Sequence, residues 1–339
     1  MGSRLDLTRD QILAYRRSVQ ALDERLPPGP DSLRQAAWAG LQDSMPRAAL
    51  LSIHARVTGT EPSSWEDPSL VQLWGPRYSA YVVAARDVGA FSLGRLPDDA
   101  KRRQFAEDLA TRLDRFLGGR TMTAGEAGHA LGGHPNLLRY AAPTGRILIR
   151  WDGARRPTVW TVPSPGVDPG EARLDLARRY LHVFGPATAA AFAEWAGIPA
   201  GAGRATIDAL GGSLMPVRTP LGDEWILAGD EPAFRAPAGS PATARLLPSG
   251  DTYFLLHGAA RELLVPDAER RATLWTSRVW PGAILVAGEI VGTWRRADAT
   301  VTVETWRRLT PEEGDAVVAE AESMPLPGLR APIRVRWAA

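Results

Sequence analysis

The chain has 339 residues, a length that suits two to four small domains better than one ordinary core. Its hydrophobic fraction of 45% and charged fraction of 23% are typical of a soluble globular protein, and no apolar run approaches the roughly 20 residues needed to cross a bilayer. The sequence has no cysteine, which excludes disulfides, thiolate catalysis and Cys-based zinc sites. The charged N-terminal residues do not resemble a signal peptide, so we expect a cytoplasmic protein.

The positive charge of this chain is almost entirely arginine. The formal net charge is only +2, and Lys101 is the single lysine. A GC-rich coding bias would produce the same composition. Arginine nevertheless carries a planar fork that suits phosphate, and a small net charge permits a basic face balanced by an acidic one.

The N-terminal part predicts three helices followed by two strands. Thr8 is a candidate N-cap for the first helix, and Asp31 or Ser32 for a second helix over 33–41. The third helix is expected over 47–57. Two strands, at 70–74 and 78–83, flank a turn at Gly75-Pro76-Arg77. This order is typical of a winged helix-turn-helix domain.

A polar turn, Gln42 to Arg47, comes directly before the third helix. Ser44 can cap that helix, and Pro46 fits its first turn, where a missing N–H costs nothing. The same turn could aim polar groups rigidly at a surface, as functional sites require. A helix cap and a functional site are therefore both open at this point.

The pattern of helices and a ribbon recurs twice. The second copy has a long helix over 98–117 and a short helix with Thr123 as its cap. The stretch from Asn136 to Tyr140 can begin a recognition-type helix, and a hairpin follows over 145–162. The third copy has helices over 171–184, 189–196 and 204–210 and a ribbon with strands at 214–218 and 224–227. The repeat is longer than solenoid periods, so we interpret it as tandem domains.

The last part of the chain is rich in strand patterns. Strands are expected over 246–248, 252–256, 283–286, 289–294 and 301–306, and a final helix over 310–324. The predicted fold is α+β, with three tandem winged helix-turn-helix domains and a β-rich C-terminal domain. The predicted boundaries are 1–95, 96–165, 166–235 and 236–339.

Winged helices present a helix to a DNA groove and a basic ribbon to the backbone. The predicted ribbons carry arginines that suit this role: Arg77, Arg146, Arg150, Arg155, Arg156 and Arg218. The same residues could be ordinary solvated ribbon positions, and winged helices also serve as protein-interaction modules.

Residues 40–49, GLQDSMPRAA, resemble the Gln-x-Gln-Asp-Pro-Arg-Ala-Ala segment of the AlkZ/YcaQ-like winged-helix DNA glycosylases. Residues 75–82 lie where members of this family typically have Arg-Gly-Thr-Leu-His, and residues 279–296 resemble the family's C-terminal strand pair. The family excises bulky alkylated purines and unhooks interstrand crosslinks, and some members protect antibiotic producers from their own genotoxins. Its motif is Gln-x-Gln or Gln-x-Asp, whereas this chain has Gln42-Asp43-Ser44, and Tyr81 stands where a histidine is common.

The resemblance implies a monofunctional glycosylase that holds a water at C1′ of the sugar. Gln42 is the first candidate to position that water, with Ser44 as a second contact and Asp43 as a secondary candidate base, since adjacent residues usually point apart. Backbone contacts are expected from basic residues that include Arg295 and Arg296 in addition to the ribbon arginines. Tyr81 and Trp294 are candidates for stacking or wedging at the lesion, although large aromatic residues more often belong to the core.

No other pattern indicates a second chemistry. His54 is expected to pack, and His129 and His134 lack an acidic or Cys partner at metal spacing, so no metal and no cofactor are predicted. A Walker-type loop is absent from the sequence. The expected partner is double-stranded DNA with alkylated purines, bound by a monomer. The alternatives are a non-catalytic winged-helix DNA-binding protein and a protein-interaction scaffold.

Overall fold

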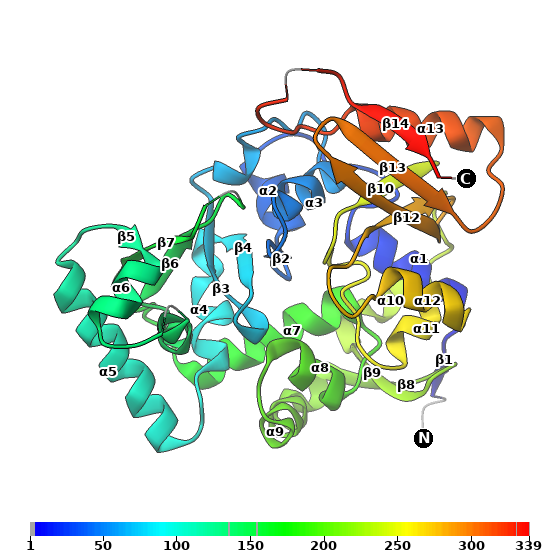
Figure 1. Cartoon of the computed structure of the whole chain (residues 1–339). Helices are drawn as coiled ribbons and strands as arrows, with labels where there is room; N and C mark the ends of the chain where they lie inside the picture. Colours follow the sequence, from blue (N-terminus) through cyan, green and yellow to red (C-terminus); the bar gives the residue numbers. More distant parts are fainter. Residues whose placement is uncertain (1–3, 135, 154, 330, 339) are drawn as a thin grey trace.

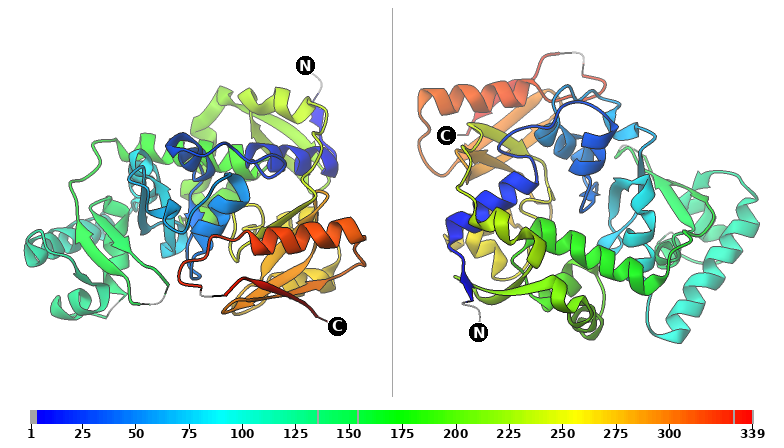
Figure 2. Two further views of the ribbon diagram at one scale, coloured as in Figure 1. Left: turned by 90° about the horizontal axis from the view of Figure 1, so that it is seen from above. Right: turned by 180° about the vertical axis from the view of Figure 1, so that it is seen from behind.

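The structure is a computed structural model that describes residues 4–134, 136–153, 155–329 and 331–338. These residues form a mixed α+β fold in which three sheets are joined by helices (Figure 1). Strand β2 and helix α3 lie centrally, with α5 and α6 on one side and the C-terminal sheet on the other, and the view from behind agrees (Figure 2). None of the helices among the described residues combines the length and the apolar character needed to span a membrane.

The largest sheet combines strands from the first two predicted domains. Its order is β2-β4-β3-β6-β7-β5. The strands are β2 (Leu41–Gln42), β3 (Leu70–Trp74), β4 (Ala80–Ala84), β5 (Met122–Thr123), β6 (Ile147–Arg150) and β7 (Thr158–Thr161). The two ribbons are joined where Gln72 of β3 pairs with Ile149 of β6. The first two ribbons are therefore one continuous surface.

The helices of the first half follow local start signals. They are α1 (Arg9–Val19), α2 (Pro30–Ala36), α3 (Ala48–Arg56), the short α4 (Val88–Phe91), α5 (Ala100–Leu117) and α6 (Ala124–Ala130). Thr8 caps α1 and Thr123 caps α6, as the sequence predicted, and the cap of α1 is completed as a capping box by Gln11. The expected helix over 33–41 is wrong in its bounds. It ends at Ala36, because Leu41 and Gln42 pair with β4 instead.

The expected recognition-type helix from Asn136 is a 3₁₀ segment, η5 (Leu137–Thr144). It packs along α5. Pro143 lies inside it and lacks the N–H that a regular α-helix would need at that position.

The third unit is built around the long helix α7 (Pro169–Phe184). It is followed by α8 (Ala189–Ala196) and α9 (Ala200–Leu210), close to the predicted ranges. Strands β8 (Leu214–Thr219) and β9 (Gly222–Leu227) form its ribbon, and β1 (Leu5–Asp6) joins that ribbon in parallel to β8. The aromatic rings of Tyr180, Phe184 and Trp195 pack against one another in the core.

The C-terminal part contains one five-stranded sheet, β10-β11-β12-β13-β14. Its strands are β10 (Ala244–Leu247), β11 (Gly282–Val286), β12 (Glu289–Ala297), β13 (Thr300–Thr305) and β14 (Arg334–Trp337). The helices are α10 (Glu231–Arg235), α11 (Ala260–Leu264), α12 (Ala268–Leu274) and α13 (Pro311–Glu322).

The expected strand over 252–256 is wrong, because this buried apolar run forms turns. The Asp251 carboxylate accepts a hydrogen bond from the Tyr253 amide at 2.9 Å, and the Phe254 amide donates to the Asp251 carbonyl at 3.1 Å. These local bonds satisfy backbone groups that a strand would have paired with a neighbour.

Candidate active site

The polar turn between β2 and α3 is held at both ends. At its start, Gln42 pairs with Tyr81 of β4, and the Asp43 amide donates to the Ala80 carbonyl at 2.7 Å. At its end, Arg47 adopts a left-handed conformation with φ 66° directly before α3, and its own side chain makes no capping bond. The turn is thus fixed by the sheet on one side and the helix on the other.

Asp43 caps α3 in place of Ser44. Its Oδ1 accepts a hydrogen bond from the Ala49 amide at 3.0 Å, and its Oδ2 accepts one from Gln72 Nε2 at 2.6 Å. The side chain is only 3% exposed, and burial raises the pKa of Asp43 to about 6 although both hydrogen bonds lower it. The expectation that Ser44 caps this helix is wrong, since Ser44 is exposed and the Ala49 amide is bound by Asp43.

Gln72 connects this cap to the second hairpin. Its side-chain oxygen accepts a hydrogen bond from the Trp151 amide at 2.6 Å, and its Nε2 also donates to the Trp151 carbonyl at 3.2 Å. Asp43 therefore lies in a buried hydrogen-bond network that joins β3, α3 and the end of β6.

Gln42 lies among donors on the other side of the turn. Its Oε1 lies 3.4 Å from Nη2 of Arg77 and 3.5 Å from the Tyr81 hydroxyl, and both groups can donate to it. On the nitrogen side, a Cβ added at Gly250 would lie 3.2 Å from Gln42 Nε2, and the backbone there has a φ of 76°, which favours glycine. The carboxamide is thus oriented with its oxygen toward Arg77 and its nitrogen toward Gly250.

His257 supports Arg77 from behind. Nη1 of Arg77 is in contact with Nε2 of His257, whose Nδ1 lies 3.4 Å from Glu194 of α8. Burial, followed by the nearby Arg77 and Arg261, lowers the pKa of His257 to about 4. A neutral imidazole can accept a hydrogen bond from Arg77 at Nε2 and donate from Nδ1 to Glu194.

The loop that carries Gly250 is anchored to α3 by a buried ion pair. Nη1 and Nη2 of Arg56 donate to the two carboxylate oxygens of Asp251 at 2.7 and 2.8 Å, and both side chains are almost fully buried. Ser52 of α3 donates to the same carboxylate at 2.7 Å. These contacts set the position of Gly250 beside Gln42.

Ser44 lines a separate hollow of about 330 Å³. Tyr78, Ser79, Arg139 and Trp151 contribute to its wall. In the described part of the chain, no hydrogen bond joins Ser44 to Gln42, so a water shared between them stays a prediction.

Two of the predicted arginine pairs flank the turn. Arg155 and Arg156 are exposed at the tip of the β6–β7 hairpin, where a Cβ added at Gly153 would lie 2.6 Å from Pro46. On the other flank, Arg295 and Arg296 line a hollow of about 270 Å³ together with Pro46. Two segments far apart in the sequence therefore meet the turn at Pro46, and both carry exposed arginines.

Two further predicted DNA contacts, Arg146 and Arg150, are half-buried and paired with acidic side chains. Arg146 lies within 4.0 Å of Glu107 and 3.8 Å of Asp114, and Arg150 pairs with Glu66 at 2.5 Å while covering the Trp65 ring at 4.0 Å. Tyr81 is fully buried.

Trp294 is also buried, and its Nε1 donates to the Leu247 carbonyl at 2.9 Å. The expectation that Tyr81 and Trp294 stack on DNA does not fit this burial, because both rings belong to the core.

Comparison with known proteins identifies the class. The family model described as "DNA glycosylase AlkZ-like" matches residues 36–325, so the chain belongs to the AlkZ-like DNA glycosylase family. Among solved structures, the fold is similar to that of the Streptomyces sahachiroi DNA glycosylase AlkZ, with a TM-score of 0.77 and 19% sequence identity over 98% of this chain and 100% of that chain. No curated protein sequence matches the chain.

Proposed function

We propose that this protein hydrolyses the N-glycosidic bond of bulky N7-alkylated purines in duplex DNA, with Gln42 positioning the water. An alkyl group on N7 makes the base cationic and weakens its bond to the sugar, so little acid catalysis is needed. The enzyme must hold a water at C1′ and stabilise an oxocarbenium-like sugar. The observation that supports this role best is the orientation of the Gln42 carboxamide by Arg77 and Tyr81.

Both contacts to the Gln42 oxygen are long, so a water can take the place of one of these two donors and make a shorter hydrogen bond. The dipole of the Gln42 carboxamide then faces the positive charge that develops on the sugar. Asp43 is assigned to the scaffold, because both of its oxygens are already bound in the protein. Ser44 remains the second candidate contact to the water.

The proposal also covers the way the protein binds DNA, its oligomeric state and the range of its substrates. The three helix-and-ribbon units act as tandem winged helices on DNA, the protein acts as a monomer without cofactor, and it is monofunctional. Crosslink unhooking and self-resistance to a DNA-alkylating natural product are tested with crosslinked duplexes and with host survival under such a compound.

The decisive experiment is incubation with duplexes that carry N7-methylguanine or a bulky N7 adduct, followed by alkaline cleavage of abasic sites. Wild type should release the base, and Gln42→Ala should lose at least about a hundredfold in rate, comparable to the loss of one oxyanion-type contact. DNA binding by both proteins is measured in parallel. If the protein binds DNA but releases the base from neither substrate, the alternative of a non-catalytic DNA-binding protein is favoured. Ser44, which replaces Gln or Asp of the family motif, would then explain the loss of catalysis.

A further inference from the structure

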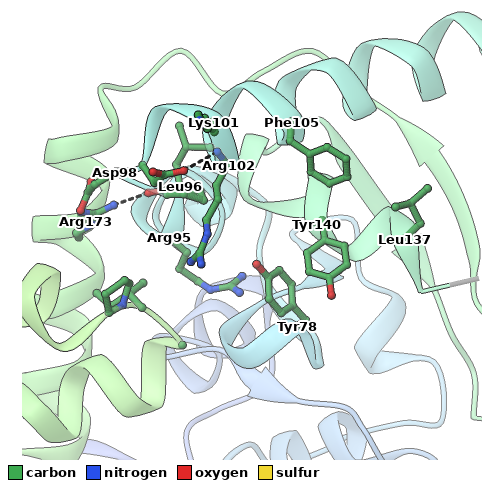
Figure 3. A pocket seen from close by; sticks show the side chains of 15 residues that line it. Tyr78, Arg95, Leu96, Asp98, Lys101, Arg102, Phe105, Leu137, Tyr140 and Arg173 are labelled. Atoms are coloured by element: carbon green, nitrogen blue, oxygen red, sulfur yellow. Dashed lines mark hydrogen bonds and ion pairs between the residues drawn. The ribbon is translucent and has the colours of Figure 1, made fainter. Parts of the chain in front are cut away.

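A hollow of about 740 Å³ opens beside the start of α5, where several parts of the chain meet (Figure 3). Its wall includes Tyr78, residues 95–99, Tyr140 of η5 and the turn between α8 and α9. Sites for drug-sized ligands have volumes of about 300–1,000 Å³. Tyr78 also lines the hollow that contains Ser44, so the two hollows share a wall.

Three aromatic rings form one side of this larger hollow. The ring centroids of Tyr78 and Tyr140 lie 5.6 Å apart and those of Phe105 and Tyr140 lie 6.4 Å apart, both in edge-to-face geometry. Phe105 is 48% exposed and Tyr140 is 53% exposed. A cluster of exposed rings at a concave site is typical of a binding surface, because aromatic side chains stack on planar ligands.

A buried cation faces the same hollow. Arg95 is 4% exposed, and its guanidinium lies 5.2 Å from the centroid of the Tyr78 ring. It donates to the carbonyls of Ala196 at 2.9 Å and Trp74 at 3.2 Å, and the described residues give it no ion pair with a carboxylate. Burial lowers the pKa of Arg95 only to about 10, so the group is charged at neutral pH.

The rim adds positive charge. Lys101 and Arg102 are exposed on the first turn of α5. The acidic residues nearby are already engaged, since Asp98 accepts hydrogen bonds from Arg173 at 2.8 and 2.9 Å and Asp99 caps α5 through the Arg102 amide. An anionic or electron-rich ligand is therefore favoured over a cationic one.

The geometry points to a subsite for the planar aromatic portion of a purine adduct, bearing an acidic or electron-rich substituent. Leu96, Leu137 and Ile198 make another part of the wall apolar, which suits the face of an aromatic ring system. One part of this inference rests on the proposed function, namely that the ring belongs to a DNA adduct. Such an adduct would reach this hollow past Tyr78, which also lines the hollow of Ser44. The ring-binding property itself belongs to the hollow.

Direct binding is tested by fluorescence titration with 1-pyrenecarboxylate. The variant Phe105→Ala/Tyr140→Ala should bind about tenfold more weakly than wild type, as expected for two lost ring contacts. Trp337→Ala, which removes a 43% exposed ring from β14, is the matched control and should bind like wild type. The subsite is ruled out if the double variant binds as tightly as wild type, or if 1-pyrenemethylamine binds as tightly as the carboxylate.

Base release separates this inference from the proposed function. Duplexes with the N7-guanine adduct of aflatoxin B1 epoxide and with N7-methylguanine are compared, after subtraction of the rate without enzyme. The double variant should lose about tenfold on the polycyclic adduct and retain wild-type release of N7-methylguanine. Equal losses on both substrates would overturn the subsite. If wild type releases neither base but the pyrene titration succeeds, the glycosylase proposal fails and the subsite stands.

Discussion

Gln42 and Asp43 are neighbours in the sequence but have opposite surroundings. Gln42 is half-buried, and its carboxamide oxygen makes only long contacts, to Arg77 and Tyr81. Asp43 is buried and its two oxygens are bound by Ala49 and Gln72. The stronger base is thus built into the scaffold, and the weaker, neutral amide is the group left near the surface.

The raised pKa of Asp43 has a consequence for stability. Because the folded-state pKa, about 6, is above the ordinary value of 3.8, the folded state holds a proton that the unfolded state has released, and the free energy of unfolding falls as pH rises through that window. The loss from this group is on the order of 2–3 kcal/mol. Asp43→Asn should lack this pH-dependent part of the free energy of unfolding. The measurement is urea unfolding of both proteins from pH 4 to pH 7, with the difference between their free energies of unfolding taken at each pH.

The difference between the two proteins is needed because histidines act in the opposite direction. His54 and His257 both have pKa values lowered to about 4 by burial, so their contribution is lost as pH falls from 6.5 toward 4. These contributions are present in both proteins and cancel. A pH-independent difference would show that Asp43 titrates normally.

His257 is predicted to act on catalysis through Arg77. His257→Ala removes the acceptor of Arg77 and should lower the rate of base release by about tenfold, the cost of one misplaced polar group near the reacting atoms. DNA affinity should change by less than about twofold, because His257 is mostly buried. His257→Gln retains an acceptor oxygen and should recover part of the rate. Equal rates for Ala, Gln and wild type would remove His257 from this role.

At the scale of elements, the site depends on the loop 248–252 being fixed to α3. Asp251→Ala leaves the buried Arg56 without its carboxylate, so the free energy of unfolding should fall by about 3–5 kcal/mol. Glu231→Gln, which breaks the exposed pair with Arg235, is the control and should cost less than about 1 kcal/mol. Comparable losses in urea unfolding for the two variants would show that the buried pair is not the anchor.

Local sequence patterns predict the ranges of helices and strands better than they predict which strands pair with one another. The ranges of α7 and α8 follow from amphipathic spacing and from caps such as Thr188, which act within one turn. The merging of two ribbons through Gln72 and Ile149, and the parallel pairing of β1, depend on contacts across the chain that no local pattern carries. Residues 252–256 fit a strand pattern but form turns, because a buried turn can be as apolar as a buried strand.

The candidate site shows the same division. Gln42 was predicted from a resemblance, and Arg77 was predicted as a phosphate contact but lies beside the Gln42 amide. His257 is 180 residues from Arg77, and Glu194 and Gly250 come from two further segments. A lone histidine and a lone glycine give no signal in one sequence, so only the fold identifies them.

At the scale of the whole molecule, exposure divides the predicted DNA contacts into two groups. Arg155 and Arg156 come from the second unit and Arg295 and Arg296 from the C-terminal sheet, and both pairs are exposed on segments that meet the turn at Pro46. Arg146 and Arg150 are paired with carboxylates of the protein instead. A cation that is already neutralised releases fewer counterions when it meets a phosphate.

This difference predicts the salt dependence of DNA binding. Replacing Arg295 and Arg296 together by Gln should reduce the slope of log K against log salt by up to about 2, since each phosphate contact contributes about 0.9. Arg155→Gln/Arg156→Gln should do the same, whereas Arg146→Gln/Arg150→Gln should change the slope by less than about 1, because both side chains are engaged with Asp114 and Glu66. The measurement is fluorescence anisotropy of a labelled duplex from 50 to about 300 mM salt. Equal slopes for the three double variants would mean that the DNA path does not follow the exposed pairs around the turn, and the assignment of this face to DNA would fail.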